Sequence, residues 1–152
     1  MHLVTEGLGI NHLRLVIGNS MGGMHTWLWA VKYPDMADVW VPMACQPTEM
    51  SGRNWLMRRM LSASIRQDPE WMGGNDSAQP RSVKFANLLY GLGTNGGNQA
   101  CYKAAPFTAD ANNFLYQWEA SRDHNPTPGL ERIRGTRVGG DVAAAYPLGL
   151  LC

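Results

Sequence analysis

The chain has 152 residues, of which 45% are apolar, so it is long enough for one globular domain and too apolar to be disordered. The formal net charge is only +1, so the composition gives no sign of nucleic acid as a partner. The three scattered cysteines (Cys45, Cys101 and Cys152) do not form a disulfide framework. No signal-peptide pattern or membrane-length apolar run is present, which predicts a cytoplasmic protein with no membrane partner.

Residues 1–12 are too few to hold a strand and its crossover before the next predicted strand. We expect at most the end of a helix there, closed by Gly7 and Gly9. The central strand of a parallel sheet needs neighbours on both sides, so the sequence is predicted to be a fragment of a larger fold.

The sequence LRLVIGNSMGG, residues 13–23, predicts a buried strand, a tight turn and the start of a helix. The turn has the pattern Gly-x-Ser-x-Gly, from Gly18 to Gly22, which is typical of a nucleophile elbow. In such an elbow the serine lies on a strained turn, so Ser20 is the candidate nucleophile and is predicted to have a positive φ. The backbone N–H of Met21 is the candidate oxyanion donor.

The glycines Gly18 and Gly22 are predicted elbow-turn residues because the strand and helix backbones approach each other there. Two other interpretations are an ordinary glycine-rich connection and a phosphate cradle. No lysine follows the glycines, which disfavours a Walker-type phosphate loop.

The next segment predicts a helix with one apolar face, followed by a second strand. Residues 33–35 (Tyr-Pro-Asp) end the helix, and residues 39–45 (VWVPMAC) predict the strand. Strand, helix and strand over this length predict a βαβ unit with a parallel pair. The expected apolar stripe of the helix consists of Met24, Trp27, Leu28 and Val31.

Residues 51–120 contain three helical patterns and no convincing strand. Thr108 is the predicted N-cap of the third helix, and loops are predicted at residues 73–76 and 93–98. Helices inserted after a βαβ unit indicate either a cap over an active site or ordinary core helices. The three apolar stripes are Met57, Met60, Leu61 and Ile65; Phe85, Leu88, Leu89 and Leu92; and Ala111, Phe114, Leu115 and Trp118.

The remaining chain predicts a return to the sheet. Residues 125–129 (NPTPG) predict a linker or turn, and residues 133–138 predict a strand that Gly139 and Gly140 interrupt. Residues 141–152 show no clear period, which suggests a truncated or frameshifted end. The predicted domains are a partial core over 1–48, a helical cap over 49–125, and an aberrant return to the core over 126–152.

A serine nucleophile requires a base and an orienting acid, which follow it in chain order in elbow enzymes. His25 lies inside the elbow helix and is expected to pack there. The neighbouring Asp123 and His124 are expected to form a solvated helix end rather than an acid–base pair. No histidine follows Asp141, which stands where a strand-end acid would fall, and His2 and His12 precede the serine. The sequence therefore predicts an incomplete triad, little turnover and no metal site.

Residues 13–25 resemble the elbow of homoserine O-acetyltransferase-like α/β-hydrolases. The resemblance continues through residues 29–35 (WAVKYPD) and reappears in residues 68–74 (DPEWMGG), which are similar to a cap segment of that family. It implies an α/β-hydrolase sheet with a helical cap, and a serine that is acylated by acetyl-CoA or by an ester. By position, it makes Ser20 the nucleophile and Met21 the oxyanion donor.

The resemblance also implies an arginine at the position of Ser62, where it would suit a substrate carboxylate. Because this chain has a serine at that position, the sequence favours a relative that hydrolyses esters over an enzyme that acylates homoserine. The predicted function is that of a serine acyltransferase that acts on a small molecule. Acetyl-CoA is the expected acyl donor, and no bound cofactor is expected. The fragment by itself is expected to be inactive. Esterase-type hydrolysis and a non-catalytic binding module are the alternatives, and self-association through an open strand edge is expected.

Overall fold

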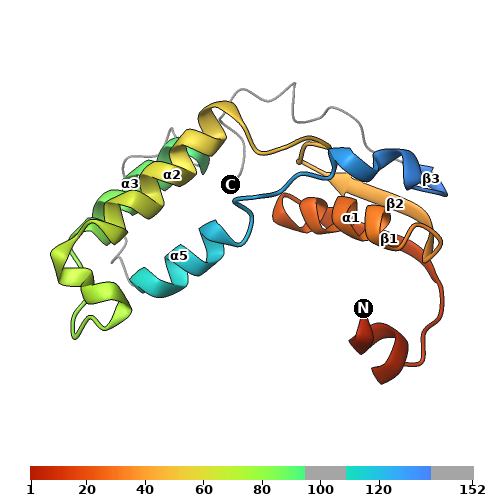
Figure 1. Cartoon of the computed structure of the whole chain (residues 1–152), viewed down its shortest axis with the longest axis horizontal. Coiled ribbons are helices and arrows are strands. Elements are labelled where there is room, and N and C mark those ends of the chain that lie inside the picture. The colour runs from red at the N-terminus through yellow and green to blue at the C-terminus, as the bar shows by residue number, and fades with distance from the viewer. Residues whose placement is uncertain (95–108, 138–152) are drawn as a thin grey trace. The chain divides into compact units, whose positions relative to one another are not determined.

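The computed structural model describes residues 1–94 and 109–137, which form two compact units (Figure 1). The elbow unit comprises Met1–Glu49 and the described residues from His124 on, and the helical unit comprises the described residues of Met50–Asp123. Each unit has its own hydrophobic core. None of the helices in the described ranges is long and apolar enough to cross a membrane.

The elbow unit contains the predicted βαβ arrangement. Strand β1 pairs with β2 in parallel, with Leu15 opposite Val39, and the short strand β3 pairs with the other side of β2. The predicted parallel pair is therefore confirmed. The elements are the π-helical turn Leu3–Gly7, β1 (Leu13–Asn19), α1 (Met21–Lys32), β2 (Ala37–Met43), the 3₁₀ turn Thr127–Arg132 and β3 (Thr136–Arg137).

Three boundaries of the elbow unit differ from the predictions. Strand β2 starts two residues before the expected Val39, because it pairs from Ala37 opposite Leu13, and it ends at Met43, because Ala44 has a φ of 49°. The linker or turn expected over 125–129 is found as a turn, because Thr127–Arg132 forms a 3₁₀ turn. The described part of the third strand is β3 (Thr136–Arg137), which starts three residues after the expected Ile133.

Helix α1 packs on one face of the sheet through a stripe that differs from the predicted one. The buried residues are Gly23, Met24, Thr26, Trp27 and Ala30. Leu28 was predicted to be buried and is 40% exposed. Met24 and Trp27 are buried as predicted, and the smaller residues Gly23, Thr26 and Ala30 complete the buried face.

The opposite face of β1 is uncovered among the described residues. Leu15 is 49% exposed and Ile17 is 56% exposed, whereas Val16 between them packs against the core of the elbow unit. Side chains alternate along a strand, so the two exposed residues share one face. In the described sheet β1 is also an edge strand, as the strand count predicted.

The helical unit contains the three predicted helices, joined in part by a 3₁₀ segment. Its core consists mainly of buried aliphatic side chains, among them Leu61 and Ile65. The elements are α2 (Gly52–Arg66), the 3₁₀ segment Pro69–Gly74, α3 (Ser82–Thr94) and α5 (Ala111–Glu119).

Among the side chains that the structure describes, the buried face of α3 matches the predicted stripe only at Leu89. Phe85 and Leu88 are 51% and 54% exposed, whereas Val83, Ala86 and Leu89 are buried. The smaller side chains allow α3 to lie close to α2, so packing rather than side-chain size decides which face is buried. On α2 the prediction fails for Met60, which is 43% exposed.

Two aspartates fix the starts of the helical segments. Asp110 is the N-cap of α5, and its carboxylate accepts a 2.8 Å hydrogen bond from the Asn113 N–H. The predicted N-cap, Thr108, is therefore wrong, and that residue itself lies outside the described ranges. Asp68 accepts 2.9 Å hydrogen bonds from the backbone N–H groups of Glu70 and Ser82. Hydrogen bonds from Ser82 are the largest cause of the lowered pKa of Asp68.

Several predictions concern residues or side chains that lie outside the described part of the structure. These are the side chain of Leu92, the loop from residue 95 to 98, Cys101 and Cys152, the end of the third strand at Val138, the Gly139–Gly140 pair, Asp141 and the tail over 141–152.

Candidate active site

Ser20 links the end of β1 to the start of α1 and has φ 53° and ψ −116°. The predicted positive φ is confirmed. Two backbone hydrogen bonds hold this conformation: the Ser20 N–H donates to the carbonyl of Met43 at 2.9 Å, and its carbonyl accepts from the Met24 N–H at 3.1 Å. A non-glycine residue in such a conformation carries strain that the surrounding structure must maintain.

The glycines of the turn have different roles. A Cβ atom on Gly18 would lie 2.1 Å from the carbonyl oxygen of Gly22, so a side chain at Gly18 does not fit. At Gly22 an added Cβ would meet nothing within 4 Å, so the expected steric need for a glycine there is wrong. The second close approach occurs at Gly23, where a Cβ would lie 2.5 Å from the Cys45 sulfur. The Gly22–Gly23 pair was the sequence signal for this contact.

Met21 is the first residue of α1 and follows Ser20 directly. Its backbone N–H lies in the first helical turn, where such groups have no intrahelical acceptor. The helix N-terminus adds a partial positive charge at this point. The turn therefore combines a hydroxyl with an N–H group of the type that stabilises an oxyanion.

The histidines differ in their surroundings, and no hydrogen bond links any of them to the Ser20 side chain among the described residues. His25 is exposed on α1 rather than packed. His12 donates from Nε2 to Asp38 at 2.8 Å, at the amino ends of the strands. His124 is only 6% exposed and donates from Nε2 to the Gln46 carbonyl at 3.3 Å, so the expected solvated helix end is wrong for this residue.

Asp123 is exposed and forms a bidentate ion pair with Arg122, which is the main cause of its lowered pKa. Its carboxylate is thus engaged by an arginine. The expectation of a solvated residue holds for Asp123.

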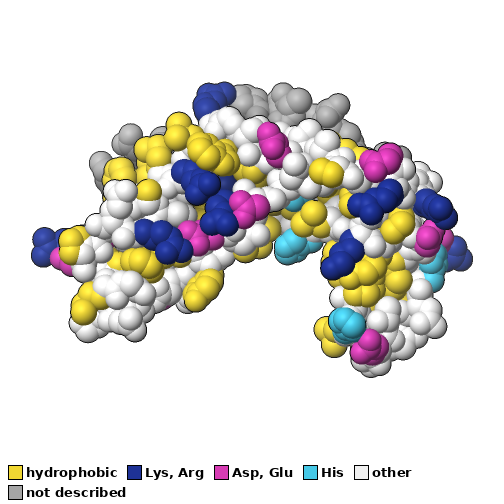
Figure 2. Space-filling model, in the orientation of Figure 1, with side chains coloured by type: hydrophobic (Ala, Val, Ile, Leu, Met, Phe, Trp, Pro, Cys, Tyr) yellow, Lys and Arg dark blue, Asp and Glu magenta, His cyan; other side chains and the backbone are white. Residues whose placement is uncertain are grey.

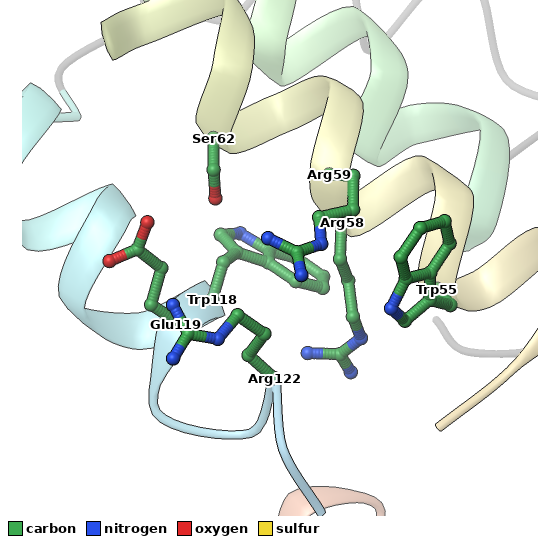
Figure 3. Close-up of a pocket in the computed structure, with 7 residues that line it drawn as sticks. All are labelled: Trp55, Arg58, Arg59, Ser62, Trp118, Glu119 and Arg122. Atoms are coloured by element: carbon green, nitrogen blue, oxygen red, sulfur yellow. The ribbon is translucent and has the colours of Figure 1, made fainter. Parts of the chain in front are cut away.

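The helical unit has a small pocket of its own that is partly open to solvent (Figure 3). Ser62, the position at which the family resemblance implies an arginine, lines it. Arginines and tryptophans form most of the remaining wall. This pocket was not predicted from the sequence, although Trp55, Arg58, Arg59 and Ser62 recur at spacings of three and four.

Sequence comparison finds similarity to homoserine O-acetyltransferases. The enzyme of that name from Solidesulfovibrio magneticus is 40% identical over 72 residues, which cover 47% of this chain and 18% of the relative. The one from Nostoc punctiforme is 42% identical over 94 residues, which cover 57% of this chain and 25% of the relative. The chain resembles the homoserine O-acetyltransferase-like α/β-hydrolases. This confirms the predicted resemblance, while the matched segments span a quarter or less of these two relatives.

Structure comparison supports the α/β-hydrolase fold. An acetylester hydrolase from Corynebacterium glutamicum superposes with a TM-score of 0.72 at 20% identity, covering 89% of this chain and 47% of the other. A homoserine O-acetyltransferase from Bacillus anthracis superposes with a TM-score of 0.59 at 23% identity, covering 80% and 41%. The predicted fold class, a partial α/β-hydrolase fold with helices, is therefore confirmed. No protein-family model matches the chain.

Proposed function

We propose that this chain supplies the nucleophile of a serine-dependent acyl transfer, with acetyl-CoA as the acyl donor and a small hydroxylated molecule such as homoserine as the acceptor. The observation that carries the proposal is the strained conformation of Ser20, held between β1 and α1 by hydrogen bonds to Met43 and Met24. The similarity to homoserine O-acetyltransferases over the matched segment supports the choice of donor and acceptor.

In the proposed reaction the Ser20 hydroxyl oxygen attacks the carbonyl carbon of the acyl donor, and its proton passes to a general base. The backbone N–H of Met21 donates to the oxygen that becomes negatively charged. The tetrahedral intermediate then collapses with loss of the thiol of the donor, which takes up the proton. The acyl group on Ser20 is finally transferred to the acceptor hydroxyl by the reverse sequence of steps.

The helical unit is proposed to act as a cap that recognises the acceptor. Among the described residues, no histidine contacts the Ser20 hydroxyl through a hydrogen bond, so we expect the chain by itself to turn over slowly. Enzymes that lack the base retain only the small rate that binding and the oxyanion hole provide.

Ester hydrolysis is the second candidate, and Ser62 is the observation that favours it. An arginine at this position would suit the carboxylate of homoserine, whereas serine offers only a hydroxyl. In the hydrolytic version water replaces the acceptor hydroxyl and attacks the acyl group on Ser20.

The test is acylation of the full chain by acetyl-CoA and, separately, by p-nitrophenyl acetate, with the acetylated residue located by peptide mass spectrometry. We expect the acetyl group on Ser20, and none at that peptide in Ser20→Ala. Ser62→Ala is the matched control and should be acetylated like the unchanged chain. Added homoserine should remove the acetyl group as an ester in an acyltransferase, whereas release as acetate indicates a hydrolase.

Acetylation elsewhere with none on Ser20, under conditions where the chain is folded, would contradict the proposal. Loss of turnover in both Ser20→Ala and His124→Ala would identify His124 as the base, against the expectation above. A chain that binds acyl donor without acetylation at Ser20 would fit a non-catalytic binding module instead.

A further inference from the structure

The pocket of the helical unit is built by helices α2 and α5 and the residue Arg122 that follows α5. In Figure 3, Trp118 lies in the middle of the lining residues, with Trp55 on the right, Glu119 on the left and Ser62 above. Figure 2 shows dark blue arginine side chains beside hydrophobic ones over these helices. The wall thus combines cationic groups with flat aromatic surfaces.

The charges of the wall do not cancel. Glu119 is occupied by a bidentate contact to Arg66, with distances of 2.9 and 2.7 Å. Arg122 is likewise paired with Asp123 at 2.7 Å. Arg58 and Arg59 make no ion pair with an acidic side chain among the described residues. The charge of Arg59 acts on the carboxylates of Glu119 and Asp123. The four arginines named here still outnumber these two carboxylates, so the cluster has a net charge of +2.

Arg58 is held firmly in place by neutral partners. Its Nε donates a 2.8 Å hydrogen bond to the Asn54 side chain, its Nη1 donates to the hydroxyl of Ser121, and its guanidinium lies 4.7 Å from the centre of the Trp118 ring. Burial lowers the pKa of the Arg58 guanidinium, since no carboxylate compensates the loss of water. A half-buried cation with neutral neighbours favours the approach of an anion.

Arg59 also lines the pocket and shares with Arg58 only the contact to an indole ring. Its guanidinium lies 5.2 Å from the centre of the Trp55 ring, and its side chain is exposed. Guanidinium groups supported on indole faces keep their N–H groups free to bind planar or tetrahedral oxyanions in a bidentate manner. The indole faces themselves offer contact to an apolar group that carries the anion.

We propose that this pocket is a binding site for a small organic oxyanion, a carboxylate or a phosphate ester, with Arg58 and Arg59 binding the anionic group and Trp55 and Trp118 contacting the apolar remainder of the molecule. The proposal rests on the charge and geometry of the helical unit alone. It does not depend on chemistry at Ser20.

The test uses the indole N–H signals of the six tryptophans in nuclear magnetic resonance spectra of the full chain. Benzoate represents a carboxylate with an apolar body and inorganic phosphate represents the phosphate, each titrated at constant ionic strength against chloride. We expect saturable shifts of the Trp55 and Trp118 signals, assigned by Trp→Phe replacement, and no comparable shift of Trp27 or Trp40, which belong to the core of the elbow unit. Saturation by either probe supports the site, and the probe with the lower dissociation constant identifies the class of anion.

Arg59→Gln should weaken binding about tenfold, as expected for loss of one charge-assisted contact. Arg53→Gln is the matched control, because Arg53 is exposed on the same helix and does not line the pocket. Arg58→Gln should weaken binding at least as much as Arg59→Gln, and Arg59→Gln decides the matter if the Arg58 variant does not fold. The proposal is overturned if neither probe saturates, or if Arg53→Gln weakens binding as much as Arg59→Gln.

Ser20→Ala should bind both probes as the unchanged chain does. Failure of acylation at Ser20 and failure of anion binding in the helical unit are therefore distinguishable outcomes.

Discussion

The backbone N–H of Ser20 donates a 2.9 Å hydrogen bond to the carbonyl oxygen of Met43, the last residue of β2. This bond ties the strained residue to the neighbouring strand, while the Met24 N–H holds the Ser20 carbonyl from the helix side at 3.1 Å. A strained conformation persists only where the surroundings fix it from several directions. The conformation of Ser20 therefore depends on both β2 and α1.

Alanine at Gly18 should be far more costly than alanine at Gly22. The new Cβ at Gly18 would lie 2.1 Å from a backbone carbonyl, so we expect a loss of at least about 2 kcal/mol in the free energy of unfolding. The new Cβ at Gly22 meets nothing within 4 Å, and the better helix propensity of alanine should add up to about 1 kcal/mol. Urea denaturation followed by tryptophan fluorescence measures both. Equal effects of the two variants would show that the close approach at Gly18 is absent.

Glycine in place of Ser20 should stabilise the chain while removing the nucleophile. Glycine adopts a φ of 53° without strain, so Ser20→Gly should raise the free energy of unfolding by about 1 kcal/mol. Ser20→Ala keeps the strain and should change it little. Thermal denaturation of the two variants gives the comparison, and a Gly variant less stable than the Ala variant would refute the assignment of strain to this residue.

Two leucines on α2 provide a matched test of the core of the helical unit. Leu61 is fully buried and Leu56 is 52% exposed. Leu61→Ala should cost about 2–5 kcal/mol through lost burial and the cavity left behind, whereas Leu56→Ala should cost less than about 1 kcal/mol. Denaturant unfolding of both variants measures the difference. Similar costs would mean that α2 presents a different face to α3 and α5.

The Arg66–Glu119 ion pair should contribute a pH-dependent part of the stability. The hydrogen bond from Arg66 lowers the pKa of Glu119 below its ordinary value of 4.5. The stabilisation is therefore present above the unfolded pKa and is lost as the pH falls through the lower folded pKa. Because half of the Arg66 side chain is exposed, the contribution should be only about 0.5 kcal/mol.

Glu119→Gln should remove this part of the acid dependence, measured as the free energy of unfolding at neutral pH and at successively lower pH. Glu131→Gln, at an exposed residue without an ion pair among the described residues, is the control and should leave the profile unchanged. A profile identical in Glu119→Gln and the unchanged chain would contradict the prediction.

The sequence by itself determined the strand, the turn with Ser20 and the helix that follows, because these depend on local patterns. β-branched residues favour extended backbone, and the Gly-x-Ser-x-Gly spacing matches one kind of strand-to-helix turn. The three helices of the helical unit were predictable for the same reason. The resemblance to homoserine O-acetyltransferase-like proteins rested on residues close together in the chain and is confirmed by sequence comparison.

Only the tertiary structure decided which side of each element is buried and which polar groups meet. Phe85 and Leu88 are more apolar than Ala86, yet Ala86 is buried, because the partner helix α2 approaches that side of α3. Gly23 rather than Gly22 is the crowded glycine because Cys45, which follows β2, lies against it. The arginine pocket combines α2 with residues about sixty positions away, and helical periodicity contains no information on such distant contacts, which depend on how the elements pack.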